Sequence, residues 1–165
     1  MLECFEYQSG ASGPVSLQLE LVYQDRQRSR CRAITRCGRD VAWFIERGVV
    51  LADGDILVAN SGECISVIAA PETLSVVECD DPLLLARAAY HLGNRHVPLQ
   101  IAEGELRYQH DHVLDDMIRG LGLTVYCADR PFYPENGAYH SHAGGHNHGQ
   151  GHSHSHDHSH GHAHG

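Results

Sequence analysis

The chain has 165 residues, enough for one ordinary domain or two small ones, and its formal charge is −9 at neutral pH. Twelve arginines and no lysine stand against 21 acidic residues, which argues against a protein that neutralises nucleic-acid phosphates. The first residues resemble no signal peptide, and no stretch approaches the roughly 20 apolar residues of a membrane span. We therefore expect a cytoplasmic protein that binds no nucleic acid and no membrane.

Residues 14–70 contain short runs of β-branched and apolar residues separated by turn signals, a pattern typical of strands. Leucines alternate with polar residues along 15–21, and Asp53-Gly54 predicts a tight turn between the apolar runs 49–51 and 56–58. The arginine-rich run 26–39 is interpreted as a solvated strand face rather than a nucleic-acid arm. Together these patterns predict a small β-rich domain over residues 1–70, which could bind a peptide or a partner.

The periodicity changes after Pro71. A predicted strand ends near Cys79, and the Asp81-Pro82 pair that follows is typical of a helix N-cap and first helical position. Apolar residues fall on one face of this helix, and Gly93 is expected to end it as a left-handed C-terminal cap. The six cysteines of the chain include no C-x-x-C pair, so we expect reduced thiols, with Cys79 and Cys127 in the core.

Two strands are predicted next, at 97–101 and 105–108, and Pro98 in the first indicates that this strand either lies at the edge of a sheet or begins there. A second helix from about Asp111 to Gly120 turns its apolar face inward and its charged residues outward. The charged residues are Asp115, Asp116 and Arg119. A strand at 123–127 completes the unit.

The resulting order is strand, helix, strand, strand, helix, strand, which is that of a split βαβ, ferredoxin-like domain. The predicted fold class is therefore α+β with two domains and a tail. We expect the β-rich domain at 1–70, the ferredoxin-like metal-binding domain at 71–134, and a disordered His-rich tail at 135–165.

The tail is the strongest chemical signal, because it holds eleven of the fifteen histidines and no large apolar residue after Ser141. H-x-H and H-x-x-x-H spacing on a flexible chain lets several imidazoles reach one metal, and imidazole suits Ni²⁺, Cu²⁺, Zn²⁺ and Co²⁺. A purification tag or a polar tail without metal function are the alternatives. The candidate tail ligands are His140, His142, His146, His148, His152, His154, His156, His158, His160, His162 and His164.

Four histidines lie in the body of the chain. His96 follows the first helix, and a single imidazole there cannot fill a coordination sphere unless a two-fold dimer presents it twice. His110 and His112 flank a predicted N-cap at Asp111, where they are either helix-terminal polar residues or a second pair of ligands. His91 is interpreted as a residue that interacts favourably with the C-terminal end of the helix dipole.

The run Gly-Asn-Arg-His-Val-Pro-Leu-Gln at 93–100 carries a resemblance to a known family. Together with the His-rich tail, the Gly-Asp-Ile-Leu run at 54–57 and the Ala-Ala-Pro-Glu junction at 69–72, it resembles the urease accessory protein UreE family of nickel metallochaperones. The resemblance implies a homodimer that binds Ni²⁺ through His96 of both subunits, with His110 and His112 in additional metal sites. It also implies delivery of nickel to the urease apoprotein in an activation complex with the GTPase UreG.

Two other functions compete with this one. A metal-dependent phosphohydrolase is suggested by His110-Asp111-His112, with Asp115-Asp116 one helical turn further on, but the sequence holds no second cluster to complete a dinuclear site. Passive metal buffering by the tail alone is the other alternative. Since a chaperone must release its metal, exposed imidazole ligands fit that role better than a closed thiolate cage, and we expect a non-enzyme.

Overall fold

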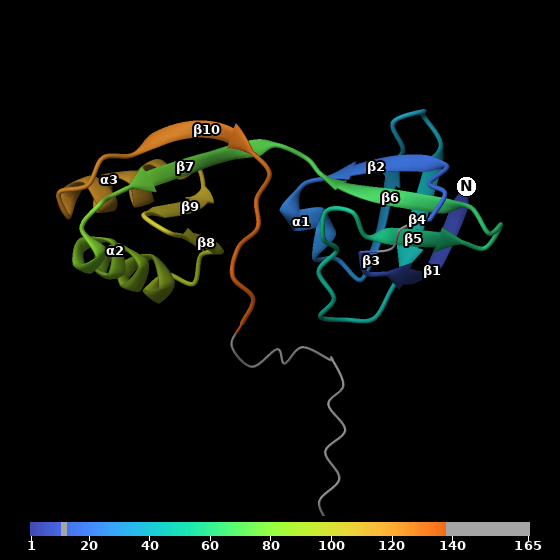
Figure 1. Cartoon of the computed structure of the whole chain (residues 1–165), viewed down its shortest axis with the longest axis horizontal. Coiled ribbons are helices and arrows are strands. Elements are labelled where there is room, and N and C mark those ends of the chain that lie inside the picture. Colours follow the sequence, from blue (N-terminus) through green and yellow to red (C-terminus); the bar gives the residue numbers. More distant parts are fainter. Residues whose placement is uncertain (11–12, 138–165) are drawn as a thin grey trace, which may run out of the picture.

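The computed structural model describes residues 1–10 and 13–137, so the predicted metal-binding tail lies outside the described residues from 138 onward, with all of its histidines. Two sheets lie side by side, joined where strand β6 runs on into strand β7 (Figure 1). The residues after β10 pass between the sheets. The mixed α+β composition, mostly sheet, is as predicted. In the described part of the chain, no helix has the length and apolar content needed to cross a membrane.

The first sheet has six strands in the order β2-β6-β5-β1-β4-β3, and its elements in chain order are β1 (Leu2–Gln8), β2 (Leu17–Leu21), α1 (Tyr23–Arg26), β3 (Arg30–Ile34), β4 (Asp40–Phe44), β5 (Ile56–Ala59) and β6 (Cys64–Ala69). Alternate residues of these strands pack a core around Trp43, which is fully buried. The sheet curls so that the turn after β3 reaches β2 at the other edge, where the Arg36 amide donates to the Gln18 carbonyl over 2.9 Å.

The first sheet contains one strand that was not predicted and lacks one that was. β1 lies in the middle of the sheet, between β5 and β4, although its sequence has only two buried side chains, Leu2 and Cys4. The apolar run 49–51 was predicted as a strand but lies in the loop between β4 and β5. Leu51 is nevertheless fully buried there. The predicted turn at Gly54 is present, with φ +86°.

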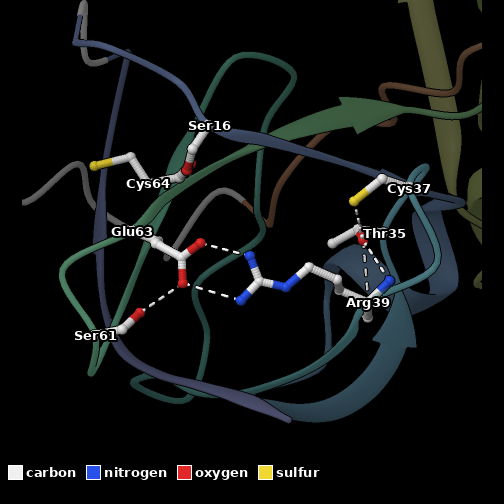
Figure 2. A network of polar contacts seen from close by, with 7 residues as sticks. All are labelled: Ser16, Thr35, Cys37, Arg39, Ser61, Glu63 and Cys64. Atoms are coloured by element: carbon white, nitrogen blue, oxygen red, sulfur yellow. Dashed lines mark hydrogen bonds and ion pairs between the residues drawn. The ribbon is translucent and has the colours of Figure 1, made fainter.

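A polar network holds the hairpins of the first sheet together (Figure 2). The Arg39 guanidinium donates to both carboxylate oxygens of Glu63, over 2.5 and 3.0 Å, and Ser61 donates to the same carboxylate over 2.9 Å. These hydrogen bonds lower the pKa of Glu63. Because both partners are partly exposed, the pair orients the β3–β4 and β5–β6 turns more than it stabilises the fold.

The second sheet has four strands in the order β10-β7-β9-β8, with every neighbouring pair antiparallel. Its elements are β7 (Glu72–Glu78), α2 (Pro82–Asn94), β8 (Leu99–Ala102), β9 (Glu105–Gln109), α3 (His112–Gly120) and β10 (Tyr126–Arg130). The two helices bury Ala88, Leu92, Leu114 and Ile118 in one core with this sheet. β8 lies at the sheet edge and begins directly after Pro98, in agreement with what this proline predicted.

The helix caps follow the sequence closely, with one exception. Asp81 caps α2 and Asp111 caps α3, each through a carboxylate that accepts from two backbone N–H groups of the first turn. The prediction that Gly93 ends α2 in a left-handed conformation was wrong, because the helix continues to Asn94. The residue with left-handed φ in this turn is His96, at +56°.

Three further expectations need correction in this unit. The last strand begins at Tyr126 rather than 123, so Cys127 is an exposed strand residue and not part of the core. Cys79 is only partly buried. Asp115, which was predicted to face solvent, is 2% exposed because the turn of α3 that it occupies packs against Tyr108.

Candidate metal site

Three side chains with metal-binding atoms converge beside the first turn of α3. His110 lies between β9 and α3, Asp115 belongs to α3, and Cys127 belongs to β10. One ligand atom from each side chain lies within 4.8 Å of those of the other two. The His110 Nδ1 atom is 3.3 Å from the Asp115 carboxylate and 3.3 Å from the Cys127 sulfur. The arrangement therefore offers nitrogen, oxygen and sulfur donors to a single ion.

The Asp115 carboxylate is fixed from its other side. The Tyr108 hydroxyl, on a fully buried ring, donates to Oδ1 over 2.7 Å, and Oδ2 faces His110. Burial, followed by the hydrogen bond with Asp115, raises the pKa of Tyr108, so the phenol stays protonated and remains a donor. The Ser75 hydroxyl on β7 lies 3.1 Å from the same Nδ1 of His110. Tyr108 and Ser75 thus orient the side chains that hold the potential ligand atoms.

The backbone around His110 is held by local hydrogen bonds. The His110 amide donates to the Thr73 carbonyl over 3.2 Å, which ties the end of β9 to β7. The next residue, Asp111, accepts from the Val113 and Leu114 amides, and these hydrogen bonds lower its pKa. The Asp111 carboxylate serves as the cap of α3. This structural role explains why an aspartate stands between His110 and His112, the arrangement that had suggested a hydrolase.

His112 is the first residue of α3 and is exposed. Within residues 1–10 and 13–137, the one group of three or more potential ligands that converge is that of His110, Asp115 and Cys127, and it does not include His112. The structure thus joins His110 to Asp115, which had been considered only for the hydrolase alternative, and to Cys127, which had been expected in the core. The ligand roles expected for His110 and His112 stay predictions.

His96 lies in the turn between α2 and β8, and its side chain is exposed. Its amide donates to the Gly93 carbonyl over 3.0 Å, and its φ of +56° is the one positive value of a non-glycine residue in the described ranges. A left-handed conformation costs an L-residue about 1–2 kcal/mol, so this turn holds strain at the residue expected to bind metal. His91, in the last turn of α2, contacts the ring of Tyr90 edge-on, with centroids 5.4 Å apart.

The eleven tail histidines, from His140 to His164, lie outside the described residues. Neither Asp115 nor Cys127 was predicted as a ligand of a nickel site. The sequence signal was weak for both residues. Asp115 lies on the face of α3 that was assigned to solvent, and Cys127 lies on β10, whose first residue was misplaced.

Comparison with known proteins identifies the family. The family model described as the UreE urease accessory protein, N-terminal domain, matches residues 6–70, and that of the C-terminal domain matches residues 72–164. A protein of Teredinibacter turnerae named Urease accessory protein UreE is 54% identical over 145 residues, covering 87% of this chain and 94% of the relative.

Two further relatives carry the same name. The Saccharophagus degradans protein is 54% identical over 147 residues, covering 87% of this chain and 88% of its own, and the Enterobacter protein is 55% identical over 131 residues, covering 79% and 86%. These matches first define the class: an accessory chaperone of urease maturation, and not an enzyme. More particularly, the chain belongs to the UreE family. The expectation of a non-enzyme is confirmed, and the phosphohydrolase hypothesis is set aside.

Proposed function

We propose that this protein is a nickel-binding metallochaperone that delivers Ni²⁺ to apo-urease. Membership of the UreE family carries the proposal, because that family implies nickel handling during urease maturation. In this proposal the protein acts in the cytoplasm as a homodimer, and it passes nickel to the urease activation complex that contains the GTPase UreG.

The proposed ligands are the motif histidine His96 of both subunits, with His110 and His112 in additional sites. The exposed position of His96 in a tight turn supports its role, since a ring that is not covered by its own chain is free to meet a second copy. The tail histidines, His140 to His164, recruit and buffer metal. Neutral imidazole binds the ion, so acid releases the metal as the rings protonate.

The domain organisation proposed for this task has three parts. Residues 1–70 form the β-rich domain, residues 71–134 form the metal-binding domain, and residues 135–165 form the tail. The strand order β10-β7-β9-β8, combined with the element order along the chain, supports a ferredoxin-like class for the second part.

The decisive experiment measures nickel binding and dimerisation together in the full chain. We expect Ni²⁺ to tighten the dimer of the unaltered protein in sedimentation experiments, because an ion shared by two subunits stabilises their association. His96→Ala removes this effect and one high-affinity site per dimer in calorimetric titration. His91→Ala, an exposed histidine one turn earlier in the chain, leaves both unchanged.

Passive buffering by the tail makes the opposite prediction. If the tail binds all the nickel, His96→Ala leaves the affinity, the stoichiometry and the response of the dimer to nickel as they were. That result would refute the interface site while retaining nickel binding.

A further inference from the structure

We propose that His110, Asp115 and Cys127 form a metal site of their own, in which Cys127 supplies a thiolate to a borderline divalent cation such as Zn²⁺ or Ni²⁺. The inference goes beyond the proposed function, because it adds a sulfur and a carboxylate ligand from residues that imidazole-based nickel transfer does not use. The inference depends on the proposed function only because both assign a ligand role to His110.

Two of the three distances between the ligand atoms already match those around a bound ion, and the Asp115 and Cys127 atoms lie within 4.8 Å of each other. Metal–nitrogen and metal–oxygen bonds of about 2.0–2.1 Å and a metal–sulfur bond of about 2.3 Å at tetrahedral angles place neighbouring ligand atoms about 3.3 to 3.6 Å apart. The His110 Nδ1 atom lies 3.3 Å from Asp115 Oδ2 and 3.3 Å from Cys127 Sγ. An ion can therefore enter with only small side-chain movements.

The buried carboxylate gives the site an electrostatic reason to bind a cation. The Asp115 side chain is 4% exposed, and removing a carboxylate from water is costly unless it is paired. Tyr108 satisfies Oδ1, which leaves Oδ2 directed at the His110 ring. A divalent cation between Oδ2, the imidazole and the sulfur compensates the charge of the carboxylate directly.

The site is open enough for exchange. The His110 side chain is 42% exposed and Cys127 is exposed, so three protein ligands leave a fourth position that water or a transfer partner can reach. A thiolate shifts the preference of the site toward softer cations than an all-imidazole site would bind.

The proposed site is also separate from the one expected at His96. Cys127 lies in β10, at one edge of the second sheet, whereas β8, which follows His96, forms the opposite edge. The two sets of ligands share no residue. Loss of one site should therefore leave the other able to bind metal.

Cobalt(II) titration of the full chain tests the proposal, because the tail histidines give no sulfur-to-metal signal. We expect a near-ultraviolet thiolate-to-cobalt charge-transfer band that saturates at one ion per chain and is displaced by Zn²⁺. Cys127→Ser abolishes the band, and Asp115→Asn weakens cobalt affinity at this site by at least about tenfold. Cys37→Ser, an exposed cysteine on the first sheet, is the matched control and leaves the band intact.

The outcomes separate this proposal from the proposed function. Absence of the band at saturating cobalt, or its persistence in Cys127→Ser, overturns the thiolate site, whatever the nickel experiments with His96→Ala give. Conversely, a band that is lost in Cys127→Ser and kept in His96→Ala supports the site even if nickel does not tighten the dimer. Because Cys127 is exposed, the serine variant should keep its fold, and its circular dichroism spectrum checks this.

Discussion

Arg26 joins the two halves of the described chain through buried contacts. It ends α1 beside the first sheet, is 2% exposed, and donates to the Leu51 carbonyl over 3.0 Å and to the Phe132 carbonyl in the segment after β10. Its guanidinium lies 5.6 Å from the ring centroid of Tyr23 and 5.4 Å from that of Tyr133. The side chain thus links a loop of the first sheet to the segment that follows the second.

The expected cost of Arg26→Ala can be worked out from these contacts. Leu51 and Phe132 are fully buried, and stranding their carbonyls costs about 1–3 kcal/mol each. Losing the contacts with two aromatic rings costs about 0.5–1 kcal/mol each. Recovered hydration of a buried cation, whose Nε has no hydrogen-bond partner among the described residues, offsets several kcal/mol of that sum. We expect a net loss of about 3 kcal/mol in the free energy of unfolding.

Urea unfolding with a metal chelator present measures this loss with two probes. Trp43, the only tryptophan, is buried in β4 and reports on the first sheet, whereas far-ultraviolet circular dichroism reports mainly on the helices of the second. The two transitions should separate in Arg26→Ala, because the substitution removes a link between the sheets. Arg28→Ala, which breaks only an exposed pair with Asp25, is the control and should change stability by less than about 0.5 kcal/mol. Equal losses in both variants would refute the reasoning.

Three further predictions concern single residues. Asp81→Ala should destabilise the protein by about 1 kcal/mol in urea unfolding, since the first turn of α2 loses its cap, and an unchanged midpoint would contradict this. His96→Gly should be about 1 kcal/mol more stable than His96→Ala, because only glycine adopts φ +56° without strain, whereas equal stabilities would show that the turn relaxes. Burial raises the pKa of Cys4 from 9.0 to about 11, so folding binds a proton between those values and stability falls as pH rises from 9 to 11. That part of the slope should be missing from the pH profile of Cys4→Ala.

The second sheet was predicted well from the sequence because its signals are local. Asp81 and Asp111 mark helix starts by chemistry that depends on two or three neighbouring residues, and the structure places both carboxylates on the expected amides. The hydrophobic period of each helix likewise needs no knowledge of the rest of the chain. The two strands between the helices were placed to within two residues for the same reason.

The first sheet was predicted less well because its pairings are long-range. β1 pairs in parallel with β4 and antiparallel with β5, so its central position depends on partners about 40 and 55 residues away. Its own sequence mixes charged and aromatic residues and alternates only weakly. The apolar run that ends at Leu51 was predicted as a strand for the opposite reason. Leu51 is buried, as its apolar side chain predicts, but it lies in a loop and pairs with no strand.

Three residues of the two proposed metal sites break local rules. Asp115 is a carboxylate on a buried helix face, Cys127 is a cysteine left exposed, and His96 takes the left-handed conformation where the nearby Gly93 would have done so without strain. Local propensity predicts the opposite at each position, and the buried Asp115 and the left-handed His96 each cost some stability where they stand. Metal binding would offset that cost for the buried carboxylate directly. The strained backbone conformation at His96 sets the direction in which its imidazole side chain leaves the turn. A nickel site shared by two subunits requires a fixed ring direction, whereas passive buffering by the tail does not.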